Sequence, residues 1–194
     1  MSVFSKFEPL FLRVPYGFSS RVRLTLYQLL GMQIGKRNRM EKSRCRRVKQ
    51  ISIGNNNAFT QGIMLWPEDA YYSGTRIKIG DKNYFNRNCM LDACGSIEIG
   101  SHNMFGPDIY ITDSNHKFGM GVSPSASPMQ KGSVKIGNYC WIGAKAVILK
   151  DVELGDYCVV AAGAVVTKSF PSGSIIAGVP AKLLTGNNAH SELL

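Results

Sequence analysis

The chain has 194 residues, of which 44% are hydrophobic and 10% aromatic, a composition typical of a folded domain. Its sequence contains no apolar run long enough to span a membrane and no signal peptide at its start, so we expect a cytoplasmic protein. The formal net charge of +10 is confined to residues 1–50, because the remaining residues carry 11 basic and 11 acidic side chains. We therefore expect a partner of the basic feature to meet only this end of the chain.

Residues 1–33 predict a basic arm followed by a helix. Within residues 21–30 one helical face is apolar, with Leu24 and Tyr27 flanking it: Val22, Leu26, Leu29 and Leu30. Ser19 or Ser20 provides an N-terminal cap, and Gly31 ends the helix. We interpret this helix as a cap on the repetitive domain that follows, with docking on a membrane or a lipid-linked acidic substrate as the alternative. An irregular arm is expected over residues 1–18, because helix-breaking residues stand among its phenylalanines: Pro9, Pro15 and Gly17.

From residue 34 onward the dominant pattern is a branched apolar residue at every sixth position. It is clearest over residues 136–171, where six consecutive units begin in this way: Ile136, Ile142, Ile148, Leu154, Val160 and Val166. Neither a helix of period 3.6 nor a strand of period 2 produces this spacing, whereas a solenoid does. Three six-residue units make one triangular coil, and each coil buries its apolar side chains against its neighbours.

Two insertions interrupt the coils. Pairs of an apolar residue and a glycine begin at positions 34, 53, 79, 99, 136 and 154, and two of the intervals exceed the length of three units by 8 and 19. The shorter insertion falls within residues 65–76, whose aromatic residues we interpret as packing or subunit contacts: Trp66, Tyr71 and Tyr72. The longer one, at about 117–135, is rich in Gly, Ser and Pro and has a length usually found in functional or disordered loops. It follows directly on His116.

The five cysteines predict neither a disulfide framework nor a metal site. Cys140 and Cys158 lie one full coil apart, at the same inward position of successive coils, and Cys89 fits that position as well. We interpret these three as small buried side chains. The odd number of cysteines and the missing signal peptide also argue against disulfides, and Cys45 and Cys94 have no assignment.

Together, the repeated units, the segment ITDSNH that ends in His116 and the closing AGVPAKLL resemble the hexapeptide-repeat acyltransferases. The resemblance covers roughly residues 34–184 and is greatest to the branch of galactoside, maltose and surface-polysaccharide O-acetyltransferases. It implies an all-β fold, a left-handed parallel β-helix of about six coils with an N-terminal helix as a cap and a long inserted loop. It also implies a homotrimer with active sites between neighbouring subunits, acetyl-CoA as co-substrate, and no metal. The acyltransferase domain would span 34–184, with 185–194 as a polar tail.

The resemblance further implies roles for individual residues. His116 matches the family's general base, because a neutral imidazole can accept the proton of the acceptor hydroxyl that attacks the thioester. The acceptor would be bound by Asn86, Asp92, Met129 and Trp141, and CoA by Ala144, Ala162, Thr167, Lys168 and Lys182. A backbone N–H near Ala144 would form the oxyanion hole. Lys182 stands where relatives often have Arg, and Thr185 where a second basic residue is common, which leaves the phosphate contacts open.

The sequence therefore predicts an acetyl-CoA-dependent O-acetyltransferase that acts on a sugar hydroxyl of a surface polysaccharide, a lipopolysaccharide or a precursor. The alternatives are N-acetylation of a nucleotide-linked amino sugar and O-acetylation of an antibiotic. We also expect residues 1–50 to contact an anionic membrane or a lipid-linked acceptor, which would hold the protein at the inner face of the membrane.

Two other classes of protein fit the sequence less well. A γ-class carbonic anhydrase shares the fold but needs three histidine ligands, and this chain has only His102 at a coil corner, His116, and His190 in the tail. A nucleic-acid-binding module would need a repeated platform of aromatic and basic residues, which the sequence lacks.

Overall fold

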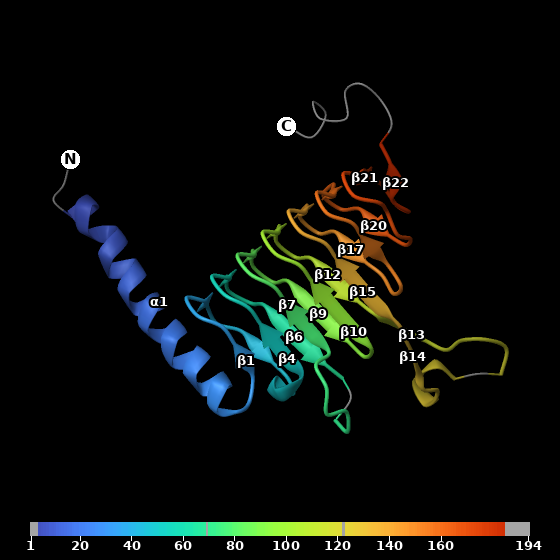
Figure 1. The fold of residues 1–194 in the computed structure, drawn as a ribbon, viewed down its shortest axis with the longest axis horizontal. Helices are drawn as coiled ribbons and strands as arrows, with labels where there is room; N and C mark the ends of the chain where they lie inside the picture. Colours follow the sequence, from blue (N-terminus) through green and yellow to red (C-terminus); the bar gives the residue numbers. More distant parts are fainter. Residues whose placement is uncertain (1–3, 69, 122, 185–194) are drawn as a thin grey trace.

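The structure is a computed structural model that describes residues 4–68, 70–121 and 123–184, with their side chains from residue 17 onward. Helix α1 (Phe4–Leu29) lies at one end, and the rest of the described chain winds into a triangular prism whose faces are parallel sheets (Figure 1). The first and third sheets of the described residues have six strands each, which gives six coils. The predicted left-handed parallel β-helix is therefore confirmed.

Each coil contributes one short strand to each face. The first sheet contains β1 (Gln33–Ile34), β4 (Ile51–Ile53), β7 (Ile77–Ile79), β10 (Ser96–Ile99), β15 (Ser133–Ile136) and β18 (Glu153–Leu154). The second contains β2 (Arg39–Met40), β5 (Ala58–Phe59), β8 (Tyr84–Phe85), β11 (Met104–Phe105), β16 (Trp141–Ile142), β19 (Val159–Val160), β21 (Ile175–Ala177) and β22 (Lys182–Leu183). The third contains β3 (Arg44–Cys45), β6 (Met64–Pro67), β9 (Met90–Ala93), β12 (Tyr110–Thr112), β17 (Val147–Ile148) and β20 (Val165–Val166). All pairs within these sheets are parallel except β21 with β22.

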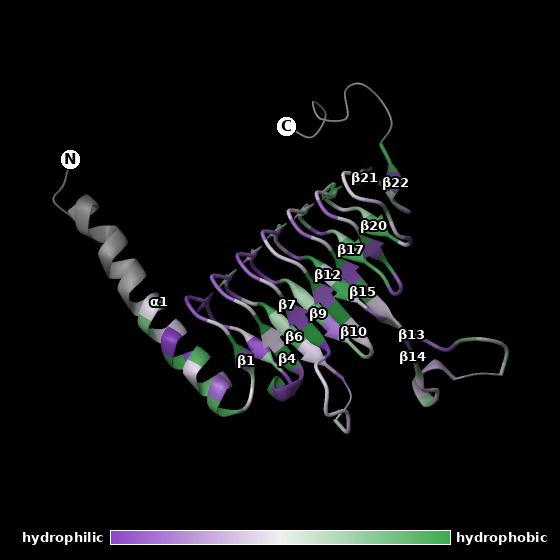
Figure 2. Ribbon diagram, in the orientation of Figure 1, coloured by the Kyte–Doolittle hydropathy of each residue, from purple (hydrophilic) through white to green (hydrophobic). Residues whose placement is uncertain are grey.

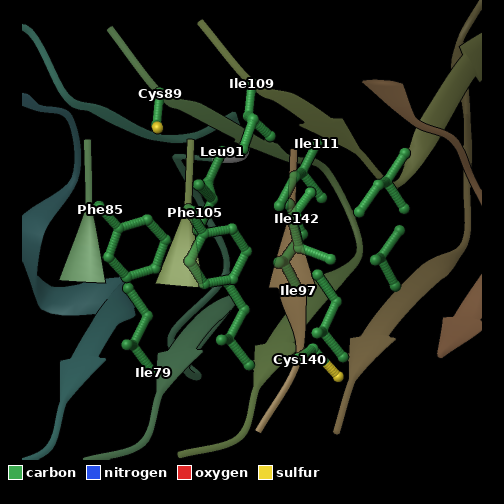
Figure 3. Close-up of a cluster of buried hydrophobic side chains, with 14 of the residues drawn as sticks. Ile79, Phe85, Cys89, Leu91, Ile97, Phe105, Ile109, Ile111, Cys140 and Ile142 are labelled. Carbon is green, nitrogen blue, oxygen red and sulfur yellow. The ribbon is translucent and has the colours of Figure 1, made fainter. Parts of the chain in front are cut away.

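The prism is filled by the apolar residues of the six-residue units. Parallel pairing in register places equivalent residues of successive coils above one another, so side chains of the same type pack together along the axis. The rings of Phe59, Phe85 and Phe105 form one such column, with centroids 5.0 and 4.3 Å apart. Figure 3 shows the stacked rings of Phe85 and Phe105. All three side chains are fully buried. The repeat thus supplies the hydrophobic core and leaves the alternate residues facing outward.

The first corner, between the first and second sheets, is held by a ladder of buried asparagines. The side-chain oxygen of Asn57 accepts the backbone N–H of Asn83 at 2.8 Å, and that of Asn83 accepts the N–H of Asn103 at 2.9 Å. Asn103 in turn accepts the N–H of Cys140 at 2.7 Å. Each of these three side-chain amides also donates to a glycine carbonyl of the next coil. The polar groups of the corner are therefore satisfied inside the prism.

The interpretation of three cysteines as small buried side chains is confirmed. Cys140 and Cys158 occupy the asparagine position of the ladder in the later coils, and Cys89 takes the equivalent place at the second corner, between the second and third sheets. Figure 3 shows Cys89 and Cys140 among the core side chains. All five cysteines of the chain are free thiols.

Helix α1 begins earlier than we expected. The prediction of an irregular arm is wrong for residues 4–18, because the helix runs continuously from Phe4 and phenylalanines recur at helical spacing along it. Residues 1–3 lie outside the described residues. Ser20 does not cap the helix; its hydroxyl accepts the N–H of Met40 at 2.8 Å and so joins α1 to the first coil. Gly31, with φ of 99°, follows the helix as predicted. Within the described residues, no helix is both long and apolar enough to cross a membrane.

Candidate functional site

The longer insertion leaves the prism at the third corner, where each coil passes from the third sheet to the first. It forms an antiparallel hairpin of β13 (Ser114–His116) and β14 (Met129–Lys131), with a short 3₁₀ helix (Pro124–Ala126) between them. Figure 1 shows the hairpin projecting from the side of the prism. The register places His116 opposite Met129. Two residues from the two ends of the insertion therefore meet at the base of the loop.

A buried aspartate fixes the origin of this hairpin. Asp113 is fully buried, and its two carboxylate oxygens accept the backbone N–H groups of Cys94 at 2.7 Å and Gly95 at 2.9 Å. Its own carbonyl accepts the N–H of Gly132, where the hairpin returns. Burial raises the pKa of Asp113 to about 6, against the opposing effect of the two amide donors. Asp113 thus ties both strands of the hairpin to the preceding coil.

The shorter insertion supplies a buried cation, Arg76, close to the buried Asp113. Arg76 is buried, and its guanidinium donates to the carbonyl oxygens of Cys94 and Gly95, the latter at 2.8 Å. The guanidinium carbon lies 3.9 Å from the centroid of the Tyr72 ring, a cation–π contact. Arg76 therefore binds the carbonyl oxygens of Cys94 and Gly95, while Asp113 binds their N–H groups. Tyr72, expected to be a packing residue, packs on this cation.

A pocket of about 530 Å³ opens beside the hairpin and contains His116. Its lining residues come from both insertions and from the third sheet: Glu68, Asp92, Cys94, Ser114, His116, Met129 and Lys131. The Nδ1 atom of His116 lies 3.2 Å from the carbonyl oxygen of Pro124. Because a carbonyl only accepts hydrogen bonds, this contact places the ring proton on Nδ1 and leaves the Nε2 lone pair free.

Two carboxylates line the pocket with His116. Asp92 accepts a hydrogen bond from the Tyr110 hydroxyl at 2.9 Å through Oδ2, while its buried Oδ1 has no partner among the described residues. Burial raises the pKa of Asp92, and the Tyr110 hydrogen bond opposes this shift. Glu68 forms an ion pair with Arg46 at 2.9 Å. Asp92 therefore has one carboxylate oxygen that is held by Tyr110 and a second, buried one that has no partner among the described residues.

The sequence did not predict four of the pocket residues, Cys94, Ser114, Lys131 and Glu68, of which Glu68 carries a carboxylate. Glu68 stands at the start of the shorter insertion, directly after Trp66 and Pro67, and its N–H donates to the carbonyl of Ala93. The guanidinium of Arg46 lies 5.3 Å from the Trp66 ring centroid, so Trp66 supports the ion pair that orients Glu68. The signal in the sequence was a pair of acidic residues, Glu68 and Asp69, within the shorter insertion.

The structure brings together only some of the expected site residues. Asp92 and Met129 share the pocket with His116. The others lie elsewhere on the same chain: Asn86, Ala144 and Ala162 at the second corner, Trp141 and Lys182 on the second sheet, and Thr167 and Lys168 after β20 at the third corner. Thr185 and His190 lie outside the described residues. The expected site residues therefore do not form a single site within one chain.

At the second corner, Ala144 and Ala162 are small residues whose backbone N–H groups are unpaired within the described chain, and we call this pair the shelf. A side chain at Gly106 would place its Cβ 2.6 Å from the Ala144 nitrogen, and one at Gly143 would lie 2.5 Å from the Ala162 nitrogen. The glycines therefore allow successive coils to stack closely here. Small residues and free donors suit an extended chain that carries amide groups, such as a pantetheine arm.

The outer faces of the prism differ in polarity. Side chains on the second sheet form an apolar row in register: Ala58, Tyr84, Met104, Trp141 and Val159. A similar row on the third sheet consists of Met64, Met90, Tyr110, Val147 and Val165. The first sheet instead presents alternating charges: Lys78, Glu98, Lys135 and Glu153. Met104 is 54% exposed and Trp141 41% exposed in the single chain. Two contiguous apolar faces of this kind are typical of subunit interfaces.

The remaining histidine of the described chain has a structural environment. The ring of His102 stacks on that of Tyr139, with centroids 4.7 Å apart, and Tyr139 stacks on Tyr157 at 5.1 Å. We therefore interpret His102 as a structural side chain of this aromatic column. Within the described residues, no group of three or more His, Cys, Asp or Glu side chains could hold a metal ion.

Sequence comparisons connect this chain with acetyl transfer. Residues 133–168 match the family model described as bacterial transferase hexapeptide (six repeats). The chain is 30% identical over 188 residues to WbbJ of Escherichia coli K12, named as an O-acetyl transferase of lipopolysaccharide biosynthesis; the match covers 92% of this chain and 94% of the relative. It is 40% identical over 126 residues to nodulation protein L of Rhizobium leguminosarum bv. viciae, covering 64% of this chain and 65% of the relative.

Solved structures have the same fold. A variant of AntD, an N-acyltransferase from Bacillus cereus in complex with dTDP and coenzyme A, matches with a TM-score of 0.72 at 20% identity, over 87% of this chain and 91% of that one. A maltose O-acetyltransferase from Clostridium difficile 630 matches with a TM-score of 0.57 at 23% identity, over 84% and 73% of the two chains.

Proposed function

As a member of the bacterial hexapeptide-repeat transferase family, the chain is an acyltransferase, and we propose that it transfers acetyl from acetyl-CoA to a sugar hydroxyl of a surface polysaccharide, a lipopolysaccharide or a precursor. The observation that carries this proposal is the pocket that His116 lines together with Asp92 and Glu68, with the Nδ1 atom of His116 held by the Pro124 carbonyl. WbbJ, the relative matched over most of both chains, supports the choice of acceptor class by its name.

His116 acts as the general base. Because Nδ1–H is donated to the Pro124 carbonyl, Nε2 takes the proton from the acceptor hydroxyl as the hydroxyl oxygen bonds to the acetyl carbon. Acetyl-CoA, when bound, supplies the activated acetyl group as a thioester. The proton held at Nε2 then passes to the CoA sulfur as the carbon–sulfur bond breaks. Imidazole is left neutral, and the products are an acetyl ester and the CoA thiol.

The pocket suits a hydroxyl-rich acceptor. The carboxylates of Asp92 and Glu68 both line the pocket, and Arg46 holds that of Glu68 in an ion pair. Carboxylates pair with the hydroxyl donors of a sugar and repel an anionic group. Met129 adds an apolar contact opposite His116. We therefore assign Asp92, Met129 and Glu68 to acceptor binding.

We propose that the CoA shelf belongs to the neighbouring subunit of a homotrimer. His116 and the shelf at Ala144 and Ala162 lie at different corners of one prism, whereas the apolar outer rows of the second and third sheets give two faces suited to packing against neighbours. The N–H of Ala144 serves as an oxyanion donor, and the later residues bind CoA: Thr167, Lys168 and Lys182. Asn86 and Trp141 contribute to the acceptor side from the same neighbouring subunit.

The proposed function is tested by incubating the purified protein with labelled acetyl-CoA and three sets of acceptors: extracted surface glycans, nucleotide-linked amino sugars and hydroxylated antibiotics. We expect label on a glycan, released by mild alkali as an ester is. Label that resists alkali on an amino sugar would identify an N-acetyltransferase instead. Label on an antibiotic alone would also contradict the proposal.

We place the enzyme in the cytoplasm, with the basic residues 1–50 toward the inner face of the membrane. No role in nucleic-acid binding is proposed, because the charge is limited to one end of the chain.

A further inference from the structure

The described part of α1 has one face that packs on the first coil. Leu24 and Tyr27 pack against the hydrophobic core. Ser20 accepts the N–H of Met40, and Arg23 donates to the Met40 carbonyl at 2.9 Å. These contacts fix the rotation of the helix about its axis. They also determine which side chains point away from the prism.

The opposite face is an exposed apolar stripe, defined as Phe18, Val22, Leu26 and Leu29. Their spacings of four, four and three residues place them on one side of the helix. Phe18 is 71% exposed, Leu26 53% and Leu29 79%. No other described residue of the chain covers the stripe. A contiguous apolar stripe of this kind on a helix marks a contact with a partner.

Cations surround the apolar stripe. Arg21 flanks it on the helix, and the first coil exposes a ring of basic side chains: Lys36, Arg37, Arg39, Lys42, Arg44 and Lys49. Glu41 is the only acidic residue between residues 17 and 50. Figure 2 shows the polar colouring of this first coil beside the mixed colouring of α1. The partner therefore offers an apolar layer together with negative charge.

We propose that the apolar stripe of α1 and the basic ring of the first coil dock the protein on an anionic phospholipid surface. The stripe enters the headgroup region and the cations contact lipid phosphates, as in interfacial amphipathic helices. Pairing of two such stripes from different copies would bring Arg21 and the basic rings together, and like charges at an interface oppose association. An anionic lipid surface offers an apolar layer for the stripe and phosphates for the basic ring.

Docking through α1 and the first coil suits the proposed function. The access of a membrane-attached acceptor to the pocket rests on that function. Subunits of a homotrimer with parallel prisms present three stripes on the same side, so three weak contacts act together. The His116 hairpin leaves the fourth coil, which at about 4.8 Å per coil stands roughly 15 Å from the docking end. A glycan attached to the membrane can reach a pocket at that height.

Vesicle co-sedimentation tests the docking directly, with the full chain and vesicles of phosphatidylcholine alone or mixed with phosphatidylglycerol. We expect binding only to the mixed vesicles, and weaker binding at high salt. Leu26→Glu with Leu29→Glu should weaken binding at least tenfold. The matched control is Phe118→Glu with Val179→Glu, which changes two exposed apolar residues far from α1 by the same charge and should bind like the wild type.

Three results would overturn the proposal: no binding to phosphatidylglycerol vesicles, equal binding by the stripe variant and the wild type, or loss of the native oligomer in the stripe variant by light scattering. The last result would identify the stripe as a subunit contact. Because vesicle binding requires neither acetyl-CoA nor an acceptor, a failure here is independent of a failure of acetyl transfer.

Discussion

The first and third corners of the prism are built from the same repeat but differ in what they carry. At the first corner the coils follow one another without a loop, asparagines satisfy each other's backbone groups, and His102 stacks in an aromatic column. At the third corner both insertions leave the coil, charges are buried at Arg76 and Asp113, and His116 faces a pocket. The first corner makes the prism rigid, and the third corner positions chemical groups on this rigid support.

Replacing the histidine of each corner by alanine should give the largest difference in kcat between the third corner and the first. We expect His116→Ala to lower kcat by roughly 10²- to 10⁴-fold, the usual effect of losing one positioned proton acceptor. Acetyl-CoA binding should change little, because Nε2 contributes only to the reacting state. His102→Ala should retain near-normal turnover. Steady-state kinetics and acetyl-CoA titration measure both, and normal turnover in a folded His116→Ala protein would remove the proposed base.

The buried charge of the third corner should make stability depend on pH. The folded-state pKa of Asp113 is about 6, above its ordinary value of 3.8, so the folded state binds this proton more tightly. The resulting stabilisation is present below pH 3.8 and is lost as the pH rises through about 6. At about 1.4 kcal/mol per pH unit, the loss is up to about 3 kcal/mol.

Urea unfolding of wild type and Asp113→Asn between pH 4 and pH 7 measures this difference, because the variant lacks the titrating group. The free energy of unfolding of the wild type should fall relative to that of the variant as the pH rises. A constant difference across this range would show that Asp113 does not titrate there.

At the first corner a substitution should cost stability without altering the chemistry. Asn83→Ala leaves the buried N–H of Asn103 and the carbonyl of Gly100 without their partners. We expect a loss of about 1–3 kcal/mol in the free energy of unfolding. The control Ser52→Ala, on the outer face of the same prism, should change it by less than about 0.5 kcal/mol. A large fall in kcat of folded Asn83→Ala protein would mean that the first corner takes part in catalysis.

The smallest effect is expected where cysteine replaces asparagine in the ladder. Cys140→Ala and Cys158→Ala remove only a buried sulfur atom, so each should lower the free energy of unfolding by no more than about 1–2 kcal/mol. Activity at a temperature where the variants remain folded should equal that of the wild type. Loss of turnover in either variant would assign the thiol a chemical role.

The sequence predicted the regular parts of the molecule well because their cause is local. An apolar residue at every sixth position specifies a coil, and departures from the three-unit length locate both insertions from the spacing alone. The third corner was predicted less completely. Arg76 and Asp113 hold the peptides at 94 and 95 from different coils, and such long-range contacts leave no periodic signal.

The start of α1 at Phe4 was missed for a different reason. Proline and glycine predict a break from local conformational preference, whereas the phenylalanine spacing over the same residues favours a helix. The local sequence also predicted that Ser20 would cap the helix. Its actual partner, the N–H of Met40, lies twenty residues further along the chain and could not be seen from the local sequence. Glu68 was not predicted because acidic side chains in loops are usually solvated.

Mixed trimers give the most direct test of a site shared between the third corner of one subunit and the second corner of its neighbour. His116→Ala removes the base, and Ala162→Trp fills the exposed shelf without entering the core. Each variant alone should be inactive in acetyl transfer. When the two are co-expressed with different tags and isolated through both, each mixed trimer has one interface that combines an intact base with an intact shelf, so activity should return to about a third of the wild-type rate. Mixed assemblies that remain inactive would contradict a site completed by the neighbouring subunit.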